Sequence, residues 1–351
     1  MGLPQINIEF IGKAESVITR SRQGIVALIL KDDVQTDDTV IYKGFEDVPT
    51  EGWSQENLDY IQKTAMGTPS KIIIERLPTT AENYTDALQR LNNKRFNYLA
   101  IPGIEDKDAT TLASWIKSRR RQKKTFKAVL PNSEANHEGI INFTTTGIKV
   151  DGKEYTTSEY TCRIAGILAG LPFTRSSTYY ELNEIDSITE LEDPDAAVDN
   201  GELILINDGE VIKIGRGVNS LTTLTGVKTE DFKSIRIMEV QDMVKDDIQT
   251  TFDKYYIGKL NNTYDNQVLF IQSVNVYYAG LGDQEILDPK FDNSAEVNVK
   301  KQRAAWEKIG VDTSDWDEQK VKERTFKRNV FLAGKIKIVD AMEDLDLDIA
   351  I

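Results

Sequence analysis

The sequence has 351 residues, of which 43 are Lys or Arg and 57 are Asp or Glu, so its net charge is −14 at neutral pH. This length suggests two or three domains, and the balance of 40% apolar and 28% charged residues describes a folded protein. The acidic balance argues against nucleic acid as a partner, because phosphate contacts are made by Lys and Arg, and against attraction to anionic membranes.

The chain has one cysteine, Cys162, and one histidine, His137. These counts exclude a disulfide within the chain and a metal site built from several histidines. The longest apolar run, residues 25–30, is far shorter than the ~20 residues of a membrane-spanning helix, and the N-terminus lacks the features of a signal peptide. We therefore expect a cytoplasmic origin, no membrane insertion and no cofactor.

Strands and helices alternate in the first part of the chain. Strands are predicted at residues 24–30, 40–45, 71–77, 96–101 and 125–130. Helices are predicted from Ser54 to about Gly67, after a cap at Thr80, and over residues 106–124. Such alternation with short loops forms parallel sheets with right-handed crossovers, so we expect a doubly wound α/β domain.

The pattern changes at about residue 139. A strand is predicted at residues 139–143 and a hairpin at residues 147–155, where Asp151 and Gly152 provide a tight turn. Thr156 and Glu159 form a capping box before a helix over about 157–171. A second hairpin is predicted at residues 201–214.

The last third predicts a small α+β domain. A helix is predicted over about 229–256, because its apolar residues recur every 3.6 positions, and a second one over 262–278. In this second helix we expect Tyr264, Val268, Ile271 and Val274 to face inward. Strands predicted at 294–300 and 330–339 offer a surface for both helices.

No set of residues predicts catalysis. His137 lies in a polar loop after a strand and could act as a general base, but no Gly-x-Ser-x-Gly motif accompanies it. We interpret it as a surface residue. Residues 215–220 begin like a dinucleotide fingerprint but lack its third glycine, so they are interpreted as a structured connection between domains.

A basic run, two acidic pairs and the single cysteine are interpreted as structural features. The basic run at residues 119–124 ends a predicted helix, where cations are favoured, or forms a patch for an acidic protein surface. The pairs Asp32-Asp33 and Asp37-Asp38 lack the spacing and the bidentate Glu of a calcium loop and are expected in a solvated turn. Cys162 is expected in or near a core.

Both ends of the chain alternate strictly between polar and apolar residues, which is typical of half-buried strands. The apolar positions are Ile6, Ile8 and Phe10 near the N-terminus and Leu345, Leu347 and Ile349 near the C-terminus. Burying these side chains alone does not offset the conformational entropy of ordering two termini. We therefore expect order where a sheet edge receives them, either in their own domain or in a neighbouring subunit.

The chain resembles the tail sheath proteins of contractile phage tails and R-type bacteriocin particles. The resemblance covers nearly the whole chain and rests on the order of five features. They are the arm at residues 4–10, the α/β unit around residues 96–103, the segment at residues 209–225, the long helix after it and the Leu-Asp-Leu-Asp C-terminal arm.

The resemblance implies a subtilisin-like α/β domain followed by a C-terminal α+β sheath domain, with extended β-arms at both ends. It places the N-terminal arm at residues 1–22, the α/β domain at 23–228, the sheath domain at 229–340 and the C-terminal arm at 341–351. Subtilisin-like describes the fold alone, because the sequence has no protease triad signature, and no enzymatic activity is expected.

The resemblance also implies hexameric rings that stack around a tail tube, with arms woven into neighbouring sheets and with baseplate and tail terminator proteins as further partners. Assembly is expected in the bacterial host cytoplasm, and contraction is expected to drive the tube through the target envelope. Two alternatives stay open: a different tail structural protein, such as a baseplate or adaptor subunit, and an α/β enzyme that uses His137.

Overall fold

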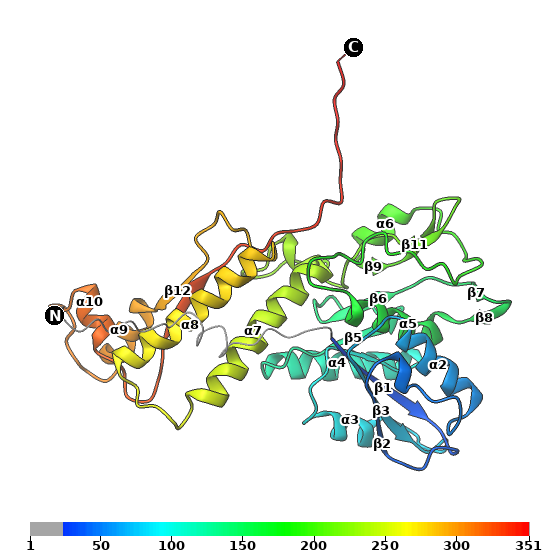
Figure 1. The fold of residues 1–351 in the computed structure, drawn as a ribbon, viewed down its shortest axis with the longest axis horizontal. Helices are drawn as coiled ribbons and strands as arrows, with labels where there is room; N and C mark the ends of the chain where they lie inside the picture. Colours follow the sequence, from blue (N-terminus) through cyan, green and yellow to red (C-terminus); the bar gives the residue numbers. More distant parts are fainter. Residues whose placement is uncertain (1–23, 351) are drawn as a thin grey trace, which may run out of the picture. The chain divides into compact units, whose positions relative to one another are not determined.

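The computed structural model describes residues 24–350 (Figure 1). The described chain divides into two compact units. The first unit contains residues 24–239 and 341–350, and the second contains residues 240–340. The division falls within one helix, α7 (Ile235–Tyr255), between Glu239 and Val240.

A seven-stranded sheet forms the centre of the first unit, with strand order β2-β3-β1-β4-β5-β6-β9. The strands are β1 (Ile25–Lys31), β2 (Thr39–Tyr42), β3 (Lys71–Leu77), β4 (Tyr98–Ala100), β5 (Lys127–Pro131), β6 (Ile140–Phe143) and β9 (Glu202–Leu203). All neighbours pair in parallel except β2, which is antiparallel to β3. The predicted parallel sheet of the α/β domain is confirmed.

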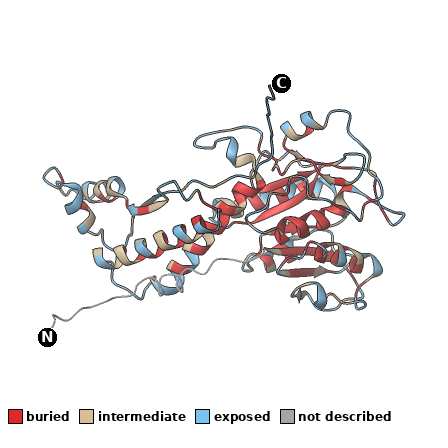
Figure 2. Ribbon diagram, turned by 45° about the horizontal axis from the view of Figure 1, so that its top comes forward, coloured by how far each residue is buried: buried red, intermediate tan, exposed pale blue. Residues whose placement is uncertain are grey.

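Helices cover both faces of this sheet, because successive strand residues point to opposite sides. The helices are α2 (Gln55–Ala65), α3 (Thr85–Leu91), α4 (Asp106–Arg121) and α5 (Thr157–Gly170). The core on one face joins the sheet to α2 and α5, and the core on the other joins it to α3 and α4. Figure 2 shows the buried residues gathered in the sheet and the helices beside it.

Capping side chains explain where several of these helices begin. The hydroxyl of Ser54 accepts the N–H of Asn57 and caps α2, and Thr156 and Glu159 form the predicted capping box of α5. The prediction that Thr80 caps a helix is wrong. The chain makes a turn after Pro78, and α3 begins only at Thr85, where the side chain of Asn83 accepts the Thr85 N–H.

Hairpins and short helices complete the first unit. They are β7 (Ile148–Val150) with β8 (Lys153–Tyr155), β10 (Leu205–Asn207) with β11 (Ile212–Ile214), α6 (Pro194–Asp199), and the 3₁₀ turns η1 (Phe45–Asp47) and η2 (Glu230–Lys233). The predicted turn between β7 and β8 is confirmed, with Asp151 and Gly152 at φ values of 50° and 76°.

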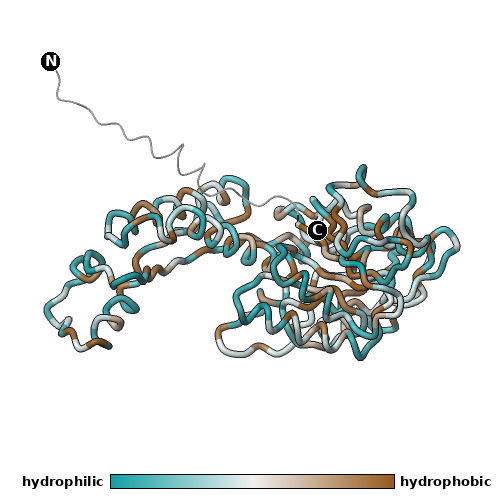
Figure 3. Tube along the Cα trace, turned by 90° about the horizontal axis from the view of Figure 1, so that it is seen from below, coloured by the Kyte–Doolittle hydropathy of each residue, from teal (hydrophilic) through white to brown (hydrophobic). Residues whose placement is uncertain are grey.

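The second unit contains a two-stranded antiparallel sheet and helices. Its elements are the rest of α7, α8 (Tyr264–Asp283), β12 (Ser294–Val297), α9 (Val299–Glu307), α10 (Glu318–Glu323) and β13 (Leu332–Lys335). Figure 3 shows hydrophobic and hydrophilic segments alternating along its helices.

Three predictions about this part of the chain need correction. The long helix does not start at 229, because Ser234 is extended at ψ 125° and separates η2 from α7. The strand predicted over 294–300 ends at Val297, because the Asn298 side chain accepts the Lys301 N–H and starts α9. On α8, Val268 and Ile271 are only half-buried, whereas Phe270, Val274 and Tyr277 are buried.

Candidate functional site

The C-terminal arm, residues 341–351, is described up to residue 350 and forms no helix or strand there (Figure 1). Leu345, Leu347 and Ile349 are 87%, 66% and 75% exposed. The strand predicted from their alternation is therefore not formed within the single chain, and its pairing with a neighbouring copy stays a prediction. Ile6, Ile8 and Phe10, the N-terminal half of the same prediction, lie outside the described residues.

The root of the C-terminal arm is held by three side chains of the first unit. The hydroxyls of Ser176 and Thr178 donate to Oε1 of Glu343 at 2.7 and 2.8 Å. The guanidinium of Arg216 pairs with the carboxylate of Asp344, and its Nε lies 3.6 Å from Oε2 of Glu343. We call Ser176, Thr178 and Arg216 the arm clamp.

Backbone hydrogen bonds hold the residues of the arm clamp beside β11. Tyr179 donates its N–H to the C=O of Ile214, and Ile214 donates to Tyr180, so the clamp hydroxyls lie beside the end of β11. Gly217 follows Arg216, and a Cβ on Gly217 would lie 2.5 Å from Oγ of Ser177. The segment interpreted from sequence as a connection thus also holds the arm, a role that local sequence did not indicate.

The β13 edge of the β12–β13 sheet is a second candidate site for contact with another strand. Asn298 donates its N–H to the C=O of Phe331 at 2.8 Å. This pair continues the register of β12 and β13, in which Val297 lies opposite Leu332. Because hydrogen-bonded and non-hydrogen-bonded pairs alternate in antiparallel sheets, the backbone groups of Leu332 and Gly334 point away from β12. In the part of the chain that the structure describes, no hydrogen bond satisfies them on that side.

The opposite edge of this sheet is closed. Asn275, on α8, accepts the N–H of Ala295 through Oδ1 at 2.7 Å and donates through Nδ2 to the Ala295 C=O at 3.4 Å. A side-chain amide therefore occupies the position where another strand would pair with β12. The sheet offers β13 as its open edge.

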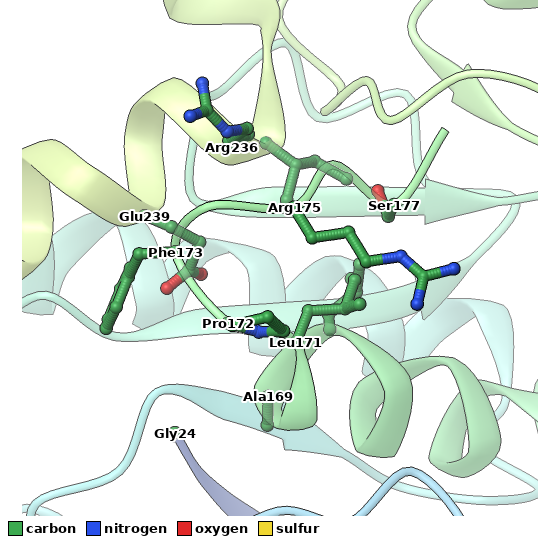
Figure 4. A pocket seen from close by; sticks show the side chains of 11 residues that line it. Gly24, Ala169, Leu171, Pro172, Phe173, Arg175, Ser177, Arg236 and Glu239 are labelled. Carbon is green, nitrogen blue, oxygen red and sulfur yellow. The ribbon is translucent and has the colours of Figure 1, made fainter. Parts of the chain in front are cut away.

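A cavity near the start of β1 offers no room for a ligand. Figure 4 shows its lining, in which the side chains of Arg175 and Arg236 extend in different directions. The enclosed volume of about 20 Å³ accommodates about one water molecule. This cavity does not support small-molecule chemistry.

His137 occupies a structural position. Its Nδ1 accepts the N–H of Gly139 at 3.0 Å, which leaves the proton of the neutral ring on Nε2. Burial lowers the pKa of His137 to about 4, against the opposing effect of Glu138, so the ring is neutral at physiological pH. The hydroxyl of Ser220 contacts the backbone of His137, not its ring.

The other candidates are also explained by structure. Cys162 is buried, and burial raises its thiol pKa to about 12, as expected for a core residue. The prediction of a solvated turn is wrong for Asp32, which is 1% exposed and accepts hydrogen bonds from the backbone of Val34, Gln35 and Ser54. Its loop carries short polar residues that fold around the carboxylate.

The basic run at residues 119–124 closes α4, whose last turn contains Arg119, Arg120 and Arg121. Arg120 lies 3.8 Å from Glu138, and the remaining cations are exposed or half-buried. Within residues 24–350, no group of three or more His, Cys, Asp or Glu side chains is arranged to hold a metal ion. None of the helices in those residues combines the length and apolar character needed to cross a bilayer.

The sequence matches two family models in succession. Residues 78–220 match the phage tail sheath protein central domain, and residues 227–351 match the phage tail sheath C-terminal domain. The chain is 39% identical to the tail sheath protein of Clostridium phage phiCD119, over 99% of this chain and 98% of that protein. It is 30% identical to the phage-like element PBSX protein XkdK of Bacillus subtilis, over 50% of this chain and 39% of that protein.

Solved structures share the fold at low sequence identity. A sheath tail protein from Desulfitobacterium hafniense has a TM-score of 0.70 at 18% identity, covering 85% of this chain and 93% of that one. A chain of the contracted sheath complex of an extracellular contractile injection system has a TM-score of 0.68 at 10% identity. The match covers 100% of this chain and 98% of that one. From its sequence matches, supported by this shared fold, the chain belongs to the phage tail sheath protein family.

Proposed function

We propose that this chain is the structural subunit of a contractile tail sheath. It polymerises as stacked hexameric rings around a tail tube, and contraction of the rings drives the tube through the target cell envelope. The observation that carries the proposal is the match over nearly the full length to a phage tail sheath protein. The exposed, alternating C-terminal arm supports it, because such a segment gains ordered structure only by pairing with a sheet.

The proposed organisation has four parts. Residues 1–22 form an N-terminal arm, residues 23–228 a subtilisin-like α/β domain, residues 229–340 the sheath domain, and residues 341–351 the C-terminal arm. The parallel sheet with helices on both faces supports the α/β assignment.

The C-terminal arm pairs, in our proposal, with β13 of the next copy. Leu332 and Gly334 offer outward backbone groups on an open edge, and a two-stranded sheet is stabilised by further strands. The arm clamp fixes Glu343 and Asp344 to their own subunit, so the segment that reaches the neighbour begins at Leu345. The N-terminal residues Ile6, Ile8 and Phe10 form a corresponding contact.

A contact between the arm of one subunit and the edge strand of the next is heterologous, and heterologous contacts build rings or helices. During contraction the subunits move as near-rigid bodies while the arms keep the lattice connected. The energy comes from new contacts between subunits and requires no nucleotide. Partners are the tail tube protein and the baseplate and tail terminator proteins, and assembly takes place in the bacterial host cytoplasm.

Negative-stain electron microscopy of the purified chain tests this proposal. The full chain is expected to form long regular tubes, and a chain lacking residues 344–351 is expected to stay folded and soluble without forming them. Normal tubes from the truncated chain would contradict the arm contact. Isolated discs or rings from the full chain would favour a baseplate or adaptor subunit.

A further inference from the structure

A cavity of about 490 Å³ lies in the second unit, where α7 ends and α8 begins. Three aromatic rings form its apolar wall: Phe252 lies 5.0 Å from Phe270 and 5.8 Å from Tyr256, and Tyr256 lies 4.7 Å from Phe270, measured between ring centroids. The volume is within the range of about 300–1,000 Å³ that is usual for binding sites.

The opposite wall of the cavity is held in place. The Asn262 side chain donates to the backbone C=O groups of Lys327 and Asn329 at 3.0 and 3.1 Å, and Thr325 donates its hydroxyl to the Asn262 C=O at 2.8 Å. The turn between the helices is thus joined to residues 325–329, so the cavity does not depend on a ligand for its shape.

The cavity also contains an unsatisfied polar atom. Gln267 lines it and is 2% exposed, with Nε2 donating to Asn262 Oδ1 at 2.7 Å. Within residues 24–350, its Oε1 has no hydrogen-bond partner. Because a buried acceptor without a partner is costly, an occupant that provides a backbone N–H is favoured over a purely apolar one.

The basic residues beside the cavity indicate an acidic occupant. Residues 320–328 contain five Lys or Arg and one acidic residue in a chain of net charge −14. Lys327 and Arg328 line the cavity and are exposed, and among the described residues neither forms an ion pair. The exposed apolar side chains of Ile257 and Leu260 complete the rim. The site fits an extended peptide with alternating aliphatic and acidic residues.

The chain itself contains such a peptide. Residues 340–351 hold five acidic residues and no basic one, and Leu345, Leu347 and Ile349 are exposed. We infer that this cavity binds the C-terminal arm of a second copy, with Lys327 and Arg328 facing Asp346 and Asp348 and the aromatic wall receiving Ile349. Val330, at the cavity, lies two residues before the start of β13, so a strand along β13 leads to this site.

The inference rests on the proposed function and is tested apart from it. The receptor is the full chain carrying Leu347→Asp, which is designed to prevent self-assembly, and the probe is a fluorescent synthetic peptide of residues 341–351. Fluorescence anisotropy is expected to show saturable binding. Lys327→Glu with Arg328→Glu is expected to weaken it at least about tenfold, the effect of losing roughly 1.4 kcal/mol.

The matched control reverses two exposed cations elsewhere in the unit, Lys300→Glu with Lys301→Glu, and is expected to change the dissociation constant by less than about threefold, as for exposed charges. A peptide carrying Asp346→Lys and Asp348→Lys is expected to restore binding to the Lys327→Glu, Arg328→Glu receptor. No binding, or equal binding to all receptors, would overturn the inference. The proposed function would still stand if deletion of residues 344–351 abolishes tubes.

Discussion

The side-chain amide of Asn275 bonds both backbone groups of Ala295, accepting the N–H at 2.7 Å and donating to the C=O at 3.4 Å. Among the described residues, this contact leaves the two-stranded sheet with one closed edge and one open edge. Since an open strand edge accepts further strands, the asymmetry directs any added strand to β13.

Replacing Asn275 with Ala is expected to lower the free energy of unfolding by about 1–3 kcal/mol, because Ala295 is 9% exposed and its backbone groups lose their partner. Urea unfolding of a chain that also carries Leu347→Asp measures this without interference from assembly. Asn266→Ala provides a control, since Asn266 bonds the backbone of an exposed turn. Equal effects of the two substitutions would contradict the role of Asn275.

Substituting Leu347 with Asp is expected to abolish tubes while leaving the monomer as stable as the wild type. Leu347 is 66% exposed and contributes little to the fold of a single subunit, but it would be buried in a neighbour. Met342→Asp, which alters an exposed apolar side chain before the clamped residues, is the matched control and is expected to retain tubes. Electron microscopy and thermal unfolding separate the two effects, and normal tubes from Leu347→Asp would refute the arm contact.

Removing the guanidinium of Arg216 is expected to release the root of the arm. Arg216→Ala should change the free energy of unfolding by less than about 1 kcal/mol, because the pairs with Glu343 and Asp344 are partly exposed. Amide hydrogen exchange at residues 341–344 should become faster. Arg175→Ala, which removes an exposed arginine over the Tyr180 ring, is the control and should leave that exchange unchanged.

Asp32 is expected to make stability depend on pH. Burial alone would raise its pKa, but hydrogen bonds from Asn57, Gln35 and Ser54 outweigh burial and lower the pKa from 3.8 to about 2. The stabilisation is therefore present above pH ~4 and is lost as pH falls toward 2. Asp32→Asn should lower the free energy of unfolding at pH 7 by about 2 kcal/mol and flatten its dependence on pH in that window.

The measurement for Asp32 is urea unfolding at pH 7, 4 and 3, with Asp37→Asn as the control because Asp37 is exposed. An equal dependence on pH in the wild type and in Asp32→Asn would show that this carboxylate does not stabilise the loop.

Sequence periodicity predicted the parallel sheet because apolar strands such as β1 and β3 alternate with helices along the chain. It failed where a polar side chain decides the structure. Asn298 ends β12 and starts α9, and Asp32 organises a loop that was expected to be solvated. Such outcomes depend on which partner a short polar side chain reaches, and periodicity carries no information about that.

The site was predictable only in part. The alternation at the C-terminus indicated a strand, but the clamp joins Arg216 to Asp344, 128 residues later in the chain, and no local pattern specifies that contact. The open edge at β13 depends likewise on Asn275, which lies on a different element. Contacts of this kind follow from the tertiary fold.

A helical reconstruction of the tubes by cryo-electron microscopy would show directly where the C-terminal arm of each subunit lies. We expect continuous density from the clamped Asp344 into a different copy, where residues 345–350 pair with the outward backbone groups of Leu332 and Gly334. Density that instead returns the arm to the sheet of its own subunit, or an assembly without ring or helical symmetry, would contradict it.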